Sequence, residues 1–430
     1  MEKTTLNRTL GLTSAVCLVA GAVIGSGVFL VAADIMGAVP SPTAGLSVWL
    51  VAGVLSLLGG LTFSELGAMF PGAGGQYVYL RESFGPLPAY LYGWSCFWVI
   101  QAGSIAAVAI AFAQYFSSFV PMGPMGVKVV ASLVIALLTM LNSLNVEKGA
   151  AVLDAVTGAK ALALIAIGAA GFFLPGGGGL EGSWTLSAPS YGVALIAAFW
   201  AYDGWNNVTF VAGEIKEPQR NVPLALAGGL AAVTLLYFFA NLTYLRLLPV
   251  ATVAASKFVA ADAARVMGGD MAARLMSAVV VMSTFGCVNG MILAGPRVTY
   301  AMAEDGRLPA WFSFVHPRWR VPTNALLAQG LWSILLVWSG RYDQLFTYVV
   351  CAAFIFYGLT GAGVLVLRRT KPELERPYKV PLYPLLPAAY VLFCAAFVAN
   401  SFREKPFEAV AGLALVLLGV PAFKFFRRAA

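Results

Sequence analysis

Charged residues are scarce in this sequence. Only 11% of its 430 residues are Asp, Glu, Lys or Arg, and 60% are hydrophobic. A soluble domain carries about 25% charged residues, whereas repeated apolar stretches of about 20 residues are typical of helices that cross a bilayer. The composition therefore excludes an ordinary soluble protein and predicts an all-α integral membrane protein.

Histidine and cysteine are also rare. The single histidine, His316, lies in a loop, and the five cysteines fall inside apolar runs without the spacing of metal ligands. We therefore expect no metal site, no cofactor and no disulfide framework. An integral-membrane enzyme would need a nucleophile–base pair or metal ligands at membrane depth, and the sequence offers no such cluster.

The formal net charge of +8 is better explained by topology than by a nucleic-acid partner. The basic residues lie in loops between apolar runs, and Lys and Arg gather in cytoplasmic loops. With the N-terminus inside, most of the 27 lysines and arginines fall on the inner side. We expect a multi-pass protein of the cell inner (plasma) membrane, surrounded by the lipid bilayer, with both termini cytoplasmic.

The apolar pattern predicts twelve transmembrane helices. They cover residues 11–36, 45–70, 85–119, 127–141, 151–173, 191–211, 223–247, 272–303, 324–339, 344–367, 383–397 and 409–425. The connecting loops are short, so we expect one membrane domain over residues 1–430.

Two of these spans are interrupted. Residues 21–29 (GAVIGSGVF) break span one, and residues 200–207 (WAYDGWNN) break span six. Glycine is a poor helix former, and free backbone inside a bilayer is tolerated only where it is buried in protein or lines a cavity. Paired interruptions in two halves of a chain indicate a transporter binding site.

The positions of the two breaks also predict the architecture. Spans one to five (10–174) correspond to spans six to ten (190–368), and because five is odd, the second copy starts from the opposite side of the membrane. This gives a five-plus-five inverted repeat. Two extra C-terminal helices, within residues 383–426, follow it.

Four motifs carry a resemblance to a known family. They are residues 21–29, residues 200–206 followed by AGEIKEPQRNVP at 212–223, STFGCVNG at 283–290 running on to Arg297, and LRR at 367–369 with RPY at 376–378. In this order they resemble the amino acid–polyamine–organocation superfamily, and within it the bacterial form of the L-type amino acid transporters. The resemblance implies the LeuT-like fold, with twelve helices of which the first and sixth are discontinuous.

An amino acid substrate brings a carboxylate and an ammonium group into the site. The first break offers backbone N–H groups, and the half-helix that follows it binds anions at its positive end. The candidate residues are Val23, Ile24, Gly25, Ser26 and Gly27. The alternative is a glycine-rich face for helix packing.

The second break would supply acceptors for the ammonium group. By resemblance these are the carbonyls of Trp200, Ala201 and Asp203, with Trp200 as an aromatic gate over the substrate. Asn206 and, in span eight, Asn289 are candidates near the side-chain pocket. Trp200 could instead be packing, and Asn289 could form a buried helix–helix hydrogen bond. Asp203 could attract the ammonium group, bind a proton or cap a helix.

Lys160 is a single embedded cation in span five. It lies nine residues from the inner end of that span, roughly 13 Å deep at 1.5 Å per residue. By resemblance it occupies the place of the sodium ion of sodium-coupled relatives, where its ammonium would bridge carbonyls of span one and a hydroxyl such as that of Ser283. The alternative is a snorkelling lysine.

These observations predict a sodium-independent transporter of neutral L-amino acids, working mainly as an exchanger by alternating access. The alternatives are a proton-coupled symporter or exporter, with Asp203 or Glu65 as the proton carrier, and a cationic amino acid or polyamine antiporter. Animal relatives are bonded to a heavy chain through a cysteine between spans three and four. Residues 117–126 contain none, so we expect no disulfide-linked heavy chain.

Acidic residues also lie near the inner ends of the spans. Glu65, Glu147 and Glu214 are candidates for a gating network, with Arg81, Arg220 and Arg297 as their expected partners. Solvated loop charges are the alternative.

Overall fold

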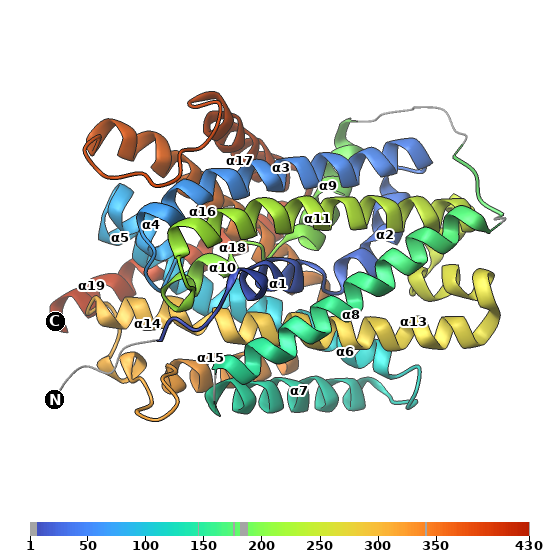
Figure 1. Cartoon of the computed structure of the whole chain (residues 1–430), viewed down its shortest axis with the longest axis horizontal. Helices are drawn as coiled ribbons and strands as arrows, with labels where there is room; N and C mark the ends of the chain where they lie inside the picture. Colours follow the sequence, from blue (N-terminus) through green and yellow to red (C-terminus); the bar gives the residue numbers. More distant parts are fainter. Residues whose placement is uncertain (1–6, 145, 175–176, 181–187, 340–341, 430) are drawn as a thin grey trace.

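A computed structural model describes residues 7–144, 146–174, 177–180, 188–339 and 342–429. Within these ranges every regular element is a helix, apart from an isolated bridge between Leu10 and Ile215. Most of the long helices run side by side along the longest axis of the molecule (Figure 1). The predicted all-α class is confirmed.

The first expected break is present in the backbone. Helix α1 (Leu12–Val23) ends one turn before α2 (Gly27–Ala38), and the residues between them do not continue the helix. Both helices are apolar and largely buried. The first predicted span therefore consists of two half-helices that are joined by Ile24, Gly25 and Ser26.

The second break has a different local cause. Helix α9 (Ala188–Tyr202) ends in a turn, and α10 (Asn207–Phe210) follows it. Gly204 in this turn has φ = +95°, a backbone conformation that glycine adopts without a Cβ penalty. A single glycine thus allows the chain to leave the helix.

The remaining elements complete the bundle. In chain order they are α3 (Pro42–Met69), α4 (Gln76–Phe84), α5 (Pro86–Ser95), the π-helix η1 (Cys96–Ile100), α6 (Gln101–Phe116), α7 (Pro124–Leu144), α8 (Val146–Phe173), the 3₁₀-helix η2 (Ala212–Glu214), α11 (Pro218–Leu247), α12 (Val250–Ala255), α13 (Val259–Ala294), α14 (Pro296–Glu304), the 3₁₀-helix η3 (Ala310–Ser313), α15 (Thr323–Ser339), α16 (Tyr342–Thr370), α17 (Leu385–Glu404), α18 (Pro406–Leu417) and α19 (Gly419–Ala429).

Ten helical segments in the described part of the chain are long and apolar enough to cross a bilayer. The two other predicted spans correspond to α9 and α15, which have 15 and 17 residues. Helix α13 starts at Val259, but its backbone is non-helical at Gly268 and Gly269. A short helix therefore precedes this kink, and the helix that follows it, together with α14, covers the predicted span 272–303. The count of twelve spans stays a prediction.

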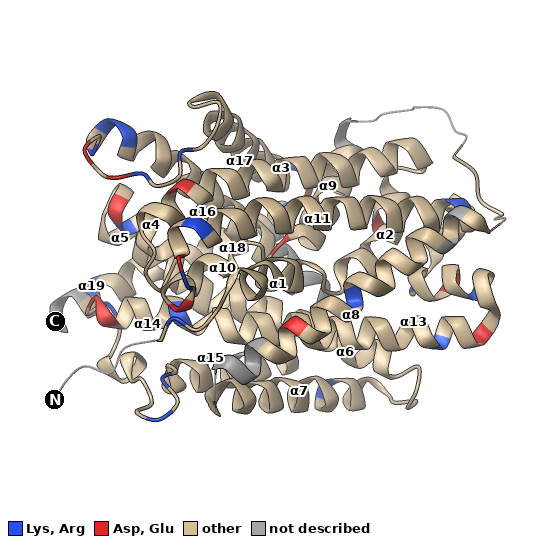
Figure 2. Cartoon of the chain, in the orientation of Figure 1, with Lys and Arg blue, Asp and Glu red and all other residues tan. Residues whose placement is uncertain are grey.

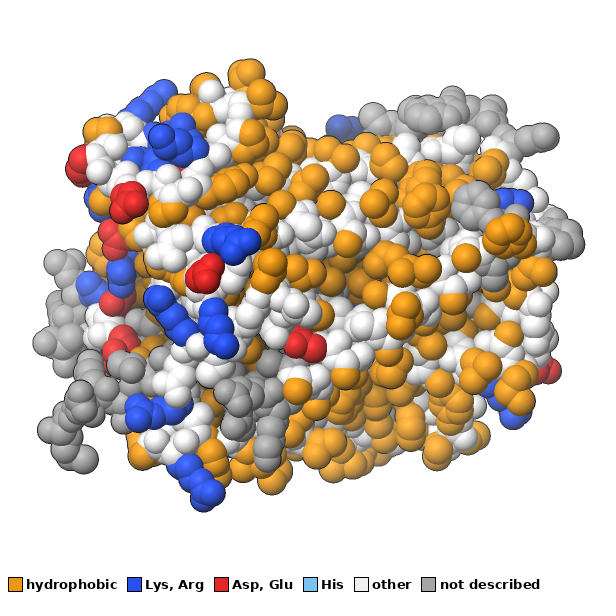
Figure 3. All heavy atoms as spheres, in the orientation of Figure 1, with side chains coloured by type: hydrophobic (Ala, Val, Ile, Leu, Met, Phe, Trp, Pro, Cys, Tyr) orange, Lys and Arg blue, Asp and Glu red, His pale blue; other side chains and the backbone are white. Residues whose placement is uncertain are grey.

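Charge is unevenly distributed along the long axis. Most of the Lys, Arg, Asp and Glu residues lie towards the end of the molecule at which both termini are found (Figure 2). Hydrophobic side chains cover the middle of the visible face (Figure 3). This arrangement is typical of a membrane protein whose basic loops gather on one side.

Packing brings the two breaks together. Helix α1 packs against α8, α11 and α13, and α2 packs against α9. A Cβ placed on Gly27 would lie 2.5 Å from the Cα of Ala201. The start of α2 and the end of α9 are therefore in backbone contact at the centre of the bundle.

Candidate functional site

The carbonyl groups of the first break are satisfied by side chains from other helices. Lys160 on α8 is fully buried, and its Nζ donates to the carbonyl oxygens of Gly21, at 2.7 Å, and Ile24, at 2.6 Å. A buried cation requires such oxygen partners. The ammonium group of Lys160, in span five, is thus bound to backbone carbonyls at the break of span one.

Helix α13 contributes two further donors. The Ser283 hydroxyl donates to the Ile24 carbonyl at 2.9 Å and lies 3.4 Å from that of Gly25. The Cys287 thiol donates to the Ala22 carbonyl at 3.0 Å. Lys160 and Ser283 therefore meet on the shared carbonyl of Ile24, which joins α1, α8 and α13.

Tyr237 on α11 connects the two breaks, a role that the sequence analysis missed. Its hydroxyl lies 2.8 Å from the Val23 carbonyl oxygen and 3.1 Å from that of Ala201. The side chain is fully buried. One of the carbonyls expected to receive the substrate ammonium, that of Ala201, thus already accepts a hydrogen bond from the protein.

At the first break, the N–H groups of Ile24 and Gly25 donate to the carbonyls of Ala20, at 2.8 Å, and Val23, at 2.7 Å. The first N–H groups of α2 have no acceptor within their own helix, as at any helix start. The Ser26 hydroxyl is buried and finds no hydrogen-bond partner among the described residues. It lines a small cavity together with Gly25, Gly27 and Trp200. The start of α2 therefore adjoins this cavity, and the Ser26 hydroxyl is a donor there without a partner among the described residues.

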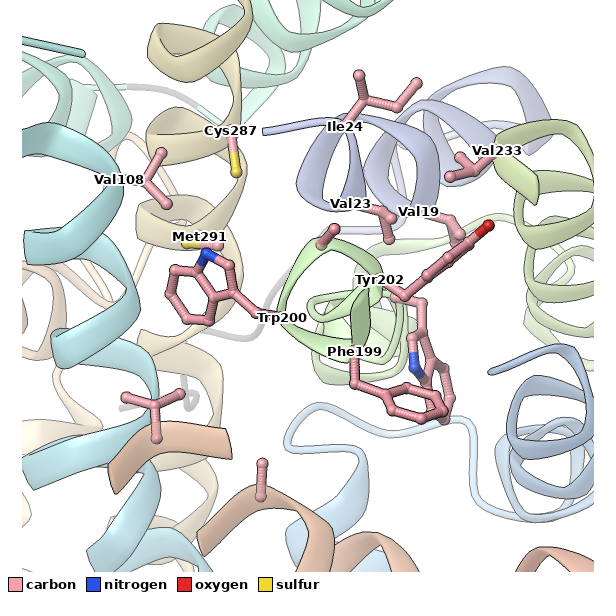
Figure 4. Close-up of a cluster of buried hydrophobic side chains, with 14 of the residues drawn as sticks. Val19, Val23, Ile24, Val108, Phe199, Trp200, Tyr202, Val233, Cys287 and Met291 are labelled. Atoms are coloured by element: carbon pink, nitrogen blue, oxygen red, sulfur yellow. The ribbon is translucent and has the colours of Figure 1, made fainter. Parts of the chain in front are cut away.

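Trp200 closes one side of the same cavity. It projects from α9 towards Val108 and Met291, whereas Phe199 and Tyr202 project to other sides (Figure 4). Trp200 as a whole residue is 7% exposed. Its place beside the glycine-rich break is compatible with the gate assignment and with packing.

Asp203 lies where three small cavities meet, since it contributes to the lining of all three. Its carboxylate accepts a 2.7 Å hydrogen bond from the Tyr357 hydroxyl on α16 and interacts with the backbone N–H of Gly204. Asn206 lies 3.2 Å from the same Tyr357 hydroxyl and donates to the Gln76 side chain. Tyr357 is a second site residue without a distinguishing signal in the sequence.

Each of these three cavities has a volume of about 10 Å³. A cavity needs about 10–15 Å³ to hold one water molecule. The site is therefore closed in this structure, and an amino acid would enter only after Trp200 or neighbouring side chains move.

Asn289 lies away from these cavity linings. It is fully buried on α13, where its Oδ1 accepts a 2.7 Å hydrogen bond from Asn142 on α7. This contact is the helix–helix hydrogen bond named above as the alternative to a pocket role.

Ion pairs lie near the end of the molecule that carries the termini. Of the arginines named as partners, Arg297 pairs with Glu214, and the pair is buried, with nitrogen–oxygen distances of 2.7 and 3.1 Å. Glu65 accepts two hydrogen bonds from Arg368.

The other arginines named as partners pair elsewhere. Arg81 contacts Asp305 and Glu82, and Arg220 contacts Glu217. The side chain of Glu147 lies outside the described residues.

Two interrupted helices around a closed central site in an apolar bundle define a membrane carrier. The chain matches the family model of amino acid permeases over residues 10–418. It belongs to this family of the amino acid–polyamine–organocation superfamily, and it is an amino acid transporter rather than an enzyme. The expected family is confirmed.

Individual relatives match over most of their length. The b(0,+)-type amino acid transporter 1 of Oryctolagus cuniculus is 34% identical over 93% of this chain and 87% of its own. The large neutral amino acids transporter small subunit 2 of Mus musculus is 33% identical over 97% and 81%. The cystine/glutamate transporter of Homo sapiens is 30% identical over 99% and 86%.

Proposed function

We propose that this amino acid transporter carries neutral L-amino acids without sodium and works mainly as an exchanger by alternating access. The supporting observation is the contact of Lys160 Nζ with the carbonyls of Gly21 and Ile24. A fixed ammonium that bridges α1 and α8 supplies the positive charge that a bound sodium ion would supply. No cation then has to enter or leave with the substrate.

The substrate carboxylate would bind at the start of α2. A helix start with free N–H groups favours an anion, and Gly25, Ser26 and Gly27 line the small cavity there. Gly25 also packs closely on α13, since an added Cβ would lie 2.7 Å from Cys287 Sγ. The ammonium would bind the carbonyls of Trp200, Ala201 and Asp203. The Ala201 carbonyl would share its lone pairs between the substrate and Tyr237.

The proposal also includes the repeat, the orientation in the membrane and the absence of a heavy chain that the sequence predicts. Residues 10–174 and 190–368 form an inverted repeat within one domain, and the end of the molecule that carries both termini faces the cytoplasm of the cell inner (plasma) membrane. The transporter works without a disulfide-linked heavy chain. The Val23–Gly27 break and Asn206 line the substrate site, and Asn289 supports it through α7.

A cationic substrate is the second candidate, and one observation favours it. Asp203 lines all three central cavities. The only hydrogen bond from a side chain that is described for it comes from the neutral hydroxyl of Tyr357. A positively charged side chain would compensate this buried charge, as would a proton.

Radiolabelled uptake into proteoliposomes tests these alternatives. For the proposed function, uptake of a neutral amino acid is accelerated by unlabelled neutral amino acid inside the vesicles and is unchanged when choline replaces sodium. A methyl ester of the substrate should not compete, because it removes the carboxylate. Sodium-stimulated uptake would contradict the proposal, uptake driven by a pH gradient would favour proton coupling, and preferential uptake of arginine would favour the second candidate.

A further inference from the structure

A large apolar groove lies on the outside of the bundle, away from the central site. Its volume is about 430 Å³, within the range of 300–1,000 Å³ for ligand pockets. Its lining is entirely apolar: Trp94, Trp98, Val99, Trp332, Leu336, Leu415 and Leu418. It is thus far larger than the closed cavities around Asp203.

The groove lies at the depth of the hydrocarbon core. Trp98 is 12 residues from the start of the span Pro86–Phe116, roughly 18 Å along a helix, and the hydrocarbon core is about 30 Å thick. Trp332 lies near the middle of α15, and Leu418 lies near the middle of the span Ala409–Phe426. Trp98, Trp332 and Leu418 therefore all lie near the middle of the bilayer.

The polar atoms of two indoles are satisfied inside the protein. Trp94 Nε1 donates to the Leu415 carbonyl at 3.1 Å, and Trp332 Nε1 donates to the Trp98 carbonyl at 2.9 Å. The indoles of Trp94, Trp98 and Trp332 also contact one another in sequence, with ring centroids 5.3 and 4.7 Å apart. These contacts leave a rigid aromatic wall that suits a hydrocarbon ligand and offers little to a polar one.

We propose that this groove binds one acyl chain of a membrane phospholipid. Water does not fill an apolar cavity, and the bilayer supplies hydrocarbon at this depth. The acyl chain would be held between α15, α18 and the π-helix η1.

Adjacent residues of one helical segment line the groove and a cavity of the central site. Trp98 and Val99 of η1 line the groove, whereas Ile100 and Gln101, the next two residues, line a cavity next to Asp203. Single-turn π-helices inside α-helices are frequent at functional sites. A lipid chain against η1 would therefore stabilise the wall of the substrate site from behind.

Native mass spectrometry of the full-length protein tests the proposal. The protein is purified in detergent and titrated with palmitoyl-oleoyl phosphatidylglycerol. L336W places an indole in the groove, and L335W is the matched control, because Leu335 is on the same helix, is exposed and is not part of the lining. We expect the wild type and L335W to retain one more tightly bound phospholipid than L336W, with thermal unfolding in detergent showing that both variants are folded.

Equal phospholipid retention by L336W and the wild type would overturn the assignment. A loss of dimer in L336W, with phospholipid retention unchanged, would also overturn it and would assign the groove to a second copy of the chain.

Discussion

Gly27 lies directly against Ala201, so the two interrupted helices touch through their backbones. A Cβ on Gly27 would lie 2.5 Å from the Cα of Ala201 and 2.6 Å from its Cβ. Ala201 is also the residue whose carbonyl receives the Tyr237 hydroxyl. The start of α2 and the end of α9, where we propose that the substrate carboxylate and ammonium bind, are thus in direct contact.

We expect Gly27→Ala to separate the two half-helices and to reduce exchange strongly. Over-packing of this kind costs about 1–3 kcal/mol. Gly37→Ala is the matched control, because Gly37 is on the same helix and a Cβ there would meet no atom within 4 Å. Uptake into proteoliposomes measures both variants, and equal activity of the two would show that the contact is not needed.

Lys160→Met should preserve much of the volume of the side chain and remove its charge. The carbonyls of Gly21 and Ile24 then lose a charged donor, and such hydrogen bonds contribute about 1.5–3 kcal/mol each. We expect exchange to fall about 10- to 100-fold while substrate binding, measured by thermal stabilisation, falls less. Rescue of Lys160→Met by sodium, absent in the wild type, would support the sodium-substitute role. A wild type that itself requires sodium would refute it.

Tyr237→Phe removes only the hydroxyl that lies between Val23 and Ala201. A buried carbonyl left without its partner costs about 1–3 kcal/mol, so the variant should be less stable and should exchange more slowly. Tyr244→Phe on the same helix is the control, because the buried Tyr244 hydroxyl has no hydrogen-bond partner among the described residues. Identical unfolding temperatures and rates for the two variants would exclude a special role for Tyr237.

Features with a local cause could be predicted from the sequence. The all-α class follows from hydrophobicity, and the two breaks follow from glycines and polar residues inside apolar runs. Lys160 was conspicuous because a charge at membrane depth needs partners. The carbonyls that it contacts belong to a break that was also visible in the sequence.

Features that depend on distant contacts could not be predicted. Tyr237 and Tyr357 resemble any tyrosine in an apolar span until α11 and α16 are placed beside the breaks. Glu65 pairs with Arg368, 303 residues away, and not with an arginine nearby in the sequence. Asn289 has the polarity of a pocket residue, but its contact with Asn142 is decided by the packing of α7 on α13.

The buried pair Glu214–Arg297 should be important for stability. Arg297→Met leaves the Glu214 carboxylate buried without its partner, and breaking a buried pair in this way costs about 3–5 kcal/mol. We expect a lower unfolding temperature in detergent and a recovery when Glu214→Gln is added. The exposed pair Arg220–Glu217 supplies the control, since Arg220→Met should change stability by no more than about 1 kcal/mol.

Trp200 should act as the cover of the closed site. It lines the cavity that contains Ser26 and is almost fully buried, so a substrate the size of an amino acid requires it to move. Trp200→Ala should leave the protein folded, raise the half-saturation concentration and slow exchange. Trp200→Phe should retain most activity, because it keeps a flat apolar surface over the ligand. Phe199→Ala is the comparison, since Phe199 projects from the same helix to a different side (Figure 4). Concentration-dependent exchange in proteoliposomes separates the roles: if Trp200→Ala kept the half-saturation concentration and rate of the wild type, Trp200 would be a packing residue and the gate would lie elsewhere.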